Sequence, residues 1–110
     1  MIKITDEHVK DGKLDKEALA EFEADVVEFE DDKIIFKTDV KFRWCDLLTS
    51  VSGATFNGDV EFSWSDSLNS VAGATFKGVV TFSWCYSLAS VAGATFEKGF
   101  KAKHCPNLKQ

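Results

Sequence analysis

The chain of 110 residues is long enough for one domain, and ten phenylalanines and three tryptophans can fill its core. One proline and seven glycines argue against disorder, and no apolar run reaches the roughly eighteen residues that a membrane-spanning helix needs. A net charge of −5 argues against direct nucleic-acid binding. Because the start of the chain has no apolar signal core and the cysteines number three, we expect a cytoplasmic protein with reduced thiols.

Charge is distributed unevenly along the chain. Residues 1–40 carry thirteen acidic and six basic side chains, whereas residues 41–110 carry five acidic and seven basic ones. The segment 17–32, EALAEFEADVVEFEDD, has eight carboxylates and no base, and residues 98–110 have four lysines and no acid. The simplest interpretation is a solvated acidic surface at one end and a lysine-protected strand edge at the other.

Residues 1–33 are expected to form an amino-terminal cap made of an acidic helix and a hairpin. In LDKEALAEFEADV the apolar residues are spaced so that they share one helix face, which predicts an amphipathic helix with Asp15 as its N-cap. These apolar residues are Leu14, Ala18, Leu19, Phe22 and Val26. The stretch VVEFEDDKIIF then predicts two short strands around Asp31 and Asp32.

Residues 34–108 repeat every twenty residues. The decapeptide SLNSVAGATF at 67–76 recurs as SLASVAGATF at 87–96 and more loosely as LLTSVSGATF at 47–56. Within a row, Val60-x-Phe62-x-Trp64 alternates as a strand does, and later apolar residues are spaced by three, as in a bend. Twenty residues cannot bury an apolar face alone, so the rows must stack. We therefore expect an α+β fold, a β-solenoid of about four coils with a parallel sheet and a helical cap.

Stacking at about 4.8 Å would place identical side chains in ladders. Glycines mark two corners of each coil, one of which we expect to need positive φ at Gly53, Gly73 and Gly93. The main columns are Phe36, Phe56, Phe76 and Phe96; Val40, Val60, Val80 and Phe100; Phe42, Phe62, Phe82 and Ala102; Trp44, Trp64, Trp84 and His104; Cys45, Ser65, Cys85 and Cys105.

The row DVEFSWSDSLNSV resembles the strand-and-turn unit of bacterial leucine-rich-repeat proteins, in which L-x-L-x-x-C-x-x-L-x-x-L recurs. Here Val60, Phe62, Ser65, Leu68 and Val71 occupy those positions, and the match extends over residues 34–108 with Phe in place of the usual Leu. The stretch ATFKGVVTFS also resembles pentapeptide-repeat proteins, whose coils likewise take twenty residues. That second match is weaker, because large residues do not recur at every fifth position.

The cysteine column is expected to be structural. The resemblance to leucine-rich repeats implies buried polar atoms that meet backbone groups of the turn. A metal site would need four ligands with local spacing such as C-x-x-C, which Cys85, His104 and Cys105 do not provide. No phosphate loop or nucleophile motif appears, so we expect neither catalysis, nor a cofactor, nor a metal.

The tryptophan column has two possible environments. If the strand continues through Trp64, the three indoles belong to the core; if it ends at Phe62, Trp44, Trp64 and Trp84 form an exposed ladder that can stack sugar rings or anchor a protein. The outward strand positions carry mixed charge and form the flat face of the repeat. They are Lys41, Arg43, Glu61, Ser63, Thr81, Ser83, Lys101 and Lys103.

Two functions therefore compete. The first is a non-enzymatic inhibitor that docks its acidic segment on the basic surface of a nucleic-acid-handling complex, as a nucleic-acid mimic. Small acidic phage proteins, including anti-CRISPR proteins, offer a class analogy, which implies action in the host cytoplasm. The contributing residues would be Glu17, Glu21, Glu23, Asp25, Glu28, Glu30, Asp31 and Asp32.

The second function is a recognition module. It would bind a protein or glycan through the strand face at Glu61 or through the tryptophan column. Neither hypothesis involves a membrane. The protein is expected to be a monomer, or a homodimer formed through the strand at 99–105.

Overall fold

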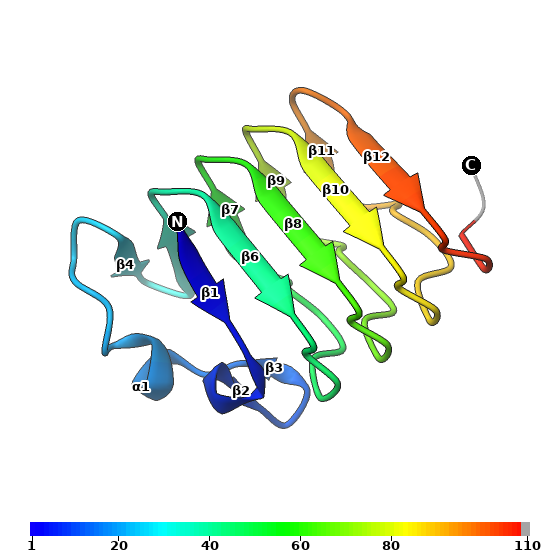
Figure 1. Ribbon diagram of the computed structural model, residues 1–110. Helices are drawn as coiled ribbons and strands as arrows, with labels where there is room; N and C mark the ends of the chain where they lie inside the picture. Colours follow the sequence, from blue (N-terminus) through cyan, green and yellow to red (C-terminus); the bar gives the residue numbers. More distant parts are fainter. Residues whose placement is uncertain (109–110) are drawn as a thin grey trace.

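The computed structural model describes residues 1–108 and is a β-solenoid of about four coils (Figure 1). Each coil contributes one strand to each of two sheets, and successive coils are related by twenty residues. Among residues 1–108, no helix is long and apolar enough to cross a membrane.

The first sheet contains five parallel strands in the order β1-β6-β8-β10-β12. Its register pairs residues that are twenty positions apart, such as Phe62 with Phe82, as the sequence period predicts. The strands are β1 (Ile2–Ile4), β6 (Val40–Arg43), β8 (Val60–Ser63), β10 (Val80–Ser83) and β12 (Phe100–Lys103). The amino-terminal strand β1, which lies outside the repeat, therefore forms one edge of this sheet beside β6 (Figure 1).

The second sheet has the order β11-β9-β7-β5-β4 and is parallel except for β4. Its strands are β4 (Val27–Glu30), β5 (Lys33–Phe36), β7 (Ala54–Phe56), β9 (Thr75–Phe76) and β11 (Thr95–Phe96). Strands β4 and β5 form the expected hairpin, which turns at Asp31 with a φ of 54°. The return path of each coil is thus more regular than the sequence pattern alone predicts.

Phenylalanine ladders from the two sheets meet in the core. Phe36, Phe56 and Phe76 are fully buried and stack with ring centroids 4.8–4.9 Å apart and nearly parallel planes. Phe62 belongs to the facing ladder and meets Phe76 edge-on at 6.2 Å. Stacking along each ladder and edge contacts between ladders together fill the space between the sheets.

The amino-terminal cap differs from the expected helix, and the α+β description with an amphipathic cap helix was wrong. The only α-helix among residues 1–108 is the single turn α1 (Lys16–Leu19). Asp15 does cap it, accepting a hydrogen bond from the backbone N–H of Glu17. The preceding chain forms the 3-10 turn η1 (Asp6–His8) and the hairpin of β2 (Val9–Lys10) with β3 (Lys13–Leu14).

Two local features explain why the helix is short. The helix ends at Leu19, and the chain then turns, with the backbone N–H groups of Val26 and Val27 both donating to the carbonyl of Glu23. Glu17 and Glu21 would repel each other one turn apart in a longer helix. The apolar stripe still reaches the first coil, because Leu19 is buried and Phe22 and Val26 pack against the core.

The repeated SVxGATF segment forms a corner. The hydroxyl of Ser70 accepts a hydrogen bond from the backbone N–H of Ala72, and Ser50 and Ser90 make the equivalent contact. Gly73 follows with a φ of 81°, which confirms the left-handed corner that we expected. The motif is therefore explained by the backbone of the turn.

Carboxylates link successive coils at the other corner. The backbone N–H of Asp59 donates to Asp39 Oδ1 at 2.8 Å, and that of Val79 donates to Asp59 Oδ1 at 2.9 Å. Gly58 lies so close to Asp39 that a Cβ atom would collide with it. Position 79 is valine, so the next N–H, that of Gly99, instead lies 3.5 Å from the carbonyl of Phe96.

The last coil closes the carboxyl-terminal end of the core. Here phenylalanine replaces valine at position 100 and alanine replaces phenylalanine at position 102. The Phe100 ring meets Phe82 edge-on at 5.9 Å and Phe96 at 5.0 Å. Phe82 is fully buried as a result. The large side chain at position 100, paired with a small one at position 102, thus covers the end of the phenylalanine ladders.

Candidate functional site: the tryptophan edge

The four repeat strands of the first sheet, β6, β8, β10 and β12, each end just before the aromatic column. The four residues of that column have left-handed backbone, with φ between 57° and 59°. They are Trp44, Trp64, Trp84 and His104. A left-handed residue interrupts strand alternation, so these side chains leave the direction of the buried phenylalanines. This conformation is rare for a bulky residue and costs about 1 kcal/mol.

The four rings form one continuous stack on the surface. Trp44 and Trp64 have centroids 5.0 Å apart and planes within 4°, and Trp64 and Trp84 are 4.8 Å apart within 3°. His104 continues the stack at 4.0 Å from Trp84. Trp44 is 54% exposed, whereas Trp64 and Trp84 are half-buried. The strands end before the tryptophans, so the column lies at the surface, with Trp44 as its exposed member.

Tyr86 widens the stack near its carboxyl-terminal end. Its ring centroid lies 6.2 Å from that of Trp84, and the residue is exposed. We call the set of Trp44, Trp64, Trp84, Tyr86 and His104 the tryptophan edge. Tryptophan and tyrosine are both enriched at interfaces and at binding hot spots.

The strand face beside this edge is largely satisfied internally. Lys41 Nζ lies 3.4 Å from Glu61 Oε2, and the Ser63 hydroxyl donates to the same oxygen at 2.9 Å. Glu61 is thus paired within the sheet. The face remains a candidate binding surface, but Glu61, the single acidic residue on these strands, already pairs with Lys41 and Ser63.

The cysteine column points inward and is structural. Cys45 Sγ donates to the carbonyl of Ile4 at 3.2 Å, and Cys85 Sγ donates to that of Phe62 at 3.7 Å. Burial raises the pKa of Cys45 and of Cys85 to about 12, so both remain thiols at neutral pH. Ser65 occupies the same column, and its hydroxyl is buried without a hydrogen-bond partner. Within residues 1–108, no group of three or more metal-binding side chains gathers.

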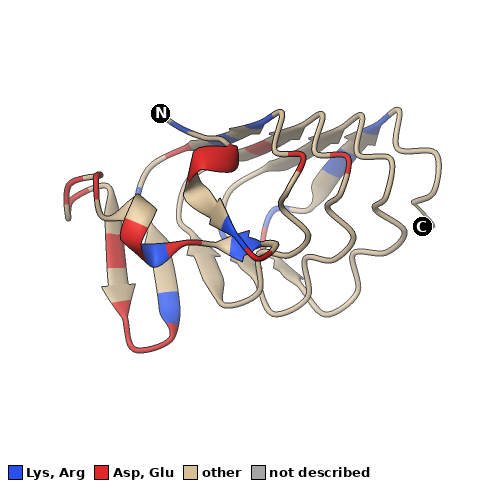
Figure 2. Ribbon diagram, turned by 90° about the horizontal axis from the view of Figure 1, so that it is seen from below, with Lys and Arg blue, Asp and Glu red and all other residues tan. Residues whose placement is uncertain are grey.

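The acidic segment lies at the amino-terminal end. All eight of its carboxylates are exposed, and Figure 2 shows acidic residues concentrated on the cap and the β4–β5 hairpin. Glu28 pairs with Lys37 at 3.3 Å, and Glu21 pairs with His8 at 2.8 Å. We call this set, Glu17, Glu21, Glu23, Asp25, Glu28, Glu30, Asp31 and Asp32, the acidic cap.

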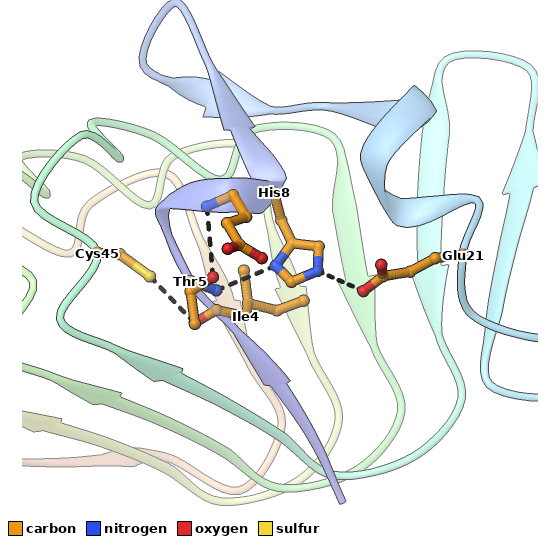
Figure 3. A network of polar contacts seen from close by, with 6 residues as sticks. Ile4, Thr5, His8, Glu21 and Cys45 are labelled. Carbon is orange, nitrogen blue, oxygen red and sulfur yellow. Dashed lines mark hydrogen bonds and ion pairs between the residues drawn. The ribbon is translucent and has the colours of Figure 1, made fainter.

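A partly buried polar contact around His8, which the sequence pattern did not predict, links two elements of the cap (Figure 3). The backbone N–H of Thr5 donates to His8 Nδ1 at 3.1 Å, which leaves the ring proton on Nε2 to donate to Glu21. The His8 ring also stacks on Phe22 at 5.3 Å. The Thr5-x-x-His8 spacing matches a capping box, and that spacing is the signal that could have revealed it.

Neither a protein-family model, nor a curated protein, nor a solved structure matches the chain.

Proposed function

We propose that the protein is a non-enzymatic recognition protein that binds its partner through the tryptophan edge. The observation that carries this proposal is the left-handed backbone at three successive tryptophans, which holds large apolar rings at the surface. The adjacent cysteine and serine side chains are buried, so the same segment can place side chains inside. Partly exposed tryptophans at a rigid edge provide contact area at low conformational cost.

Capture of partners by the immobilised protein tests this proposal. Trp64→Ala and Trp84→Ala together should weaken partner binding at least tenfold, with little dependence on salt. Phe29→Ala is the matched control, because Phe29 is an exposed aromatic on β4, outside the tryptophan edge. Undiminished capture by the doubly substituted protein would contradict the proposal.

The acidic cap supports a second candidate function. Its exposed carboxylates cluster at one end of the molecule, which favours docking on a basic surface of a nucleic-acid-handling complex. In that case the protein would block nucleic-acid access, as an inhibitor of the phage anti-CRISPR type does.

Charge reversal separates this candidate from the first. Glu23→Lys with Glu30→Lys avoids the carboxylates that pair with His8 and Lys37. If the acidic cap is the docking surface, this double variant should lose binding. Binding by the unaltered protein should weaken steeply between 50 and 500 mM salt, a range over which the screening length falls about threefold. If binding survives both changes, the acidic cap is not the docking surface.

The coils are proposed to be of the leucine-rich-repeat type. Burial of the positions that carry the resemblance supports this, namely Val60, Phe62, Ser65, Leu68 and Val71. A cytoplasmic location is likewise proposed, and the three free thiols support it.

A further inference from the structure

The aromatic stack ends at Trp44, which has an aromatic neighbour on one face only. Trp64 lies between two indoles, and Trp84 lies between Trp64 and His104, so both faces of each ring are occupied. Trp44 stacks only on Trp64 and is the most exposed tryptophan. The inner rings therefore offer edges to a ligand, whereas Trp44 offers a face.

The register of the first sheet explains why the stack stops there. Strand β1 pairs Ile4 with Phe42, and two residues further along this alignment sets Asp6 in the tryptophan column. Asp6 belongs to η1 and is not aromatic. Its Oδ1 accepts a hydrogen bond from the backbone N–H of Leu47 at 3.0 Å, which holds the carboxylate beside the edge.

A groove of about 480 Å³ lies at this end of the edge. Trp44 supplies its aromatic wall, and every other lining side chain is polar or charged. The lining residues are Lys3, Thr5, Asp6, Glu7, Arg43 and Trp44. The groove is shallow and largely open to solvent, so a sugar ring would rest on Trp44 and keep one side in water.

The lining matches the chemistry of a neutral sugar. One face of a pyranose ring carries C–H groups that pack on an indole, and its hydroxyl groups both donate and accept hydrogen bonds. Lys3 and Arg43 supply donors, whereas Asp6 and Glu7 supply acceptors. The two positive and two negative charges balance, so a phosphate would meet the carboxylates and a cation would meet Lys3 and Arg43.

We propose that this groove, the Trp44 groove, binds a neutral pyranose ring of a glycan. The proposal rests on the proposed function and names the ligand class for one end of the tryptophan edge. The ring stacks on the open face of Trp44, and its hydroxyl groups contact the charged residues at the rim.

Nitrogen–proton NMR of the full chain, titrated separately with cellobiose, lactose and N,N′-diacetylchitobiose, tests the proposal. At least one disaccharide should produce saturable shifts at the Trp44 indole N–H and at the amides of residues 3–7. The indoles of Trp64 and Trp84 should move less. Trp44→Gly should weaken that binding at least tenfold, because it removes the ring while suiting the left-handed backbone.

Phe29→Ala is the matched control, since Phe29 is an exposed aromatic on β4 outside the tryptophan edge, and it should retain sugar binding. The proposal is overturned if no disaccharide gives saturable shifts, or if Trp44→Gly binds sugar as well as the unaltered chain does. If sugars fail but captured partners still depend on Trp64 and Trp84, only the glycan assignment is lost. If both fail, the proposed function is lost with it. Capture of a protein that needs Trp44 would assign the groove to a protein side chain and overturn the glycan proposal.

Discussion

The phenylalanine ladders and the tryptophan ladder follow the same stacking rule in opposite environments. Phe42 and Phe62 stack at 4.5 Å inside the core with no exposed surface, whereas Trp44 and Trp64 stack at 5.0 Å at the surface. Both ladders arise from the twenty-residue period. What separates them is one left-handed residue per coil, placed immediately after the strand.

This difference shows that repetition alone does not decide which ladder is core. A period of twenty aligns identical residues whether they are inside or outside. The backbone conformation at positions 44, 64 and 84 then selects the environment. Consecutive residues such as Trp64 and Ser65 can therefore serve recognition and stability separately.

The largest expected effect compares the two ladders directly. Phe62→Ala should destabilise the fold by about 3–5 kcal/mol, because it removes a buried ring and leaves a cavity. Trp64→Ala should cost only about 1–3 kcal/mol, the contribution of two stacked contacts. Urea unfolding followed by circular dichroism measures both. Equal losses would mean that the tryptophan ladder is part of the core.

Unfolding at alkaline pH tests the burial of the cysteine side chains that follow the tryptophans in the sequence. Cys45 and Cys85 have pKa values near 12 in the fold, against 9.0 for a free thiol. Above pH 9 the unfolded chain loses these protons first, so stability should fall by about 1 kcal/mol per thiol per pH unit. Below pH 9 these two thiols should contribute no pH dependence.

The matched control for this prediction replaces both cysteines by alanine. Unfolding free energies at pH 8, 9 and 10 should fall less steeply for that variant, because every other ionisable group is common to both proteins. Parallel slopes would show that the thiols are not protected from ionisation.

A smaller effect is expected at Ser65. Its buried hydroxyl has no partner, so Ser65→Ala should stabilise the protein by about 1 kcal/mol. Ser65→Cys should do at least as well, because cysteine fills this position in the other coils. Thermal unfolding measures the change, and a lower melting temperature for both variants would indicate that the hydroxyl is satisfied.

The smallest effect isolates the backbone at the tryptophan edge. Glycine adopts positive φ without penalty, so Trp64→Gly should be more stable than Trp64→Ala by about 0.5–1 kcal/mol. At an ordinary strand position the order would be reversed. Chemical unfolding of the two variants side by side provides the measurement.

The solenoid could be predicted from the sequence because its signal is repeated. Residues of the same kind recur at the same positions in four successive repeats. Within one repeat, the alternation typical of a strand identifies Val60 and Phe62 as buried. The corners at Gly53, Gly73 and Gly93 could be predicted because glycine adopts positive φ without a steric penalty. The cap lacks such repetition, so the helical spacing from Leu14 to Val26 predicts a longer helix than the single turn that forms before the chain bends at Glu23.

The tryptophan edge could be predicted only as one of two alternatives. The alternating pattern of the strand continues through Trp64 in the sequence, and a tryptophan gives no sign that its backbone is left-handed. The Trp44 groove depends on β1 joining the sheet in register with β6, a long-range pairing outside the repeat. The hydrogen bond between His8 and Glu21 likewise joins separate elements of the cap.

The corner carboxylates have a consequence for lengthening the array. Asp39 and Asp59 each accept a hydrogen bond from the backbone of the next coil, whereas Val79 cannot, and β12 still pairs with β10 along its whole length. The corner carboxylate therefore ties neighbouring coils together without deciding how many coils there are, and the exchange at positions 100 and 102 closes the core. Duplicating residues 40–59, the row that ends in Asp59, would add a coil whose corner already serves its successor, so the molecule can grow without redesign of its core.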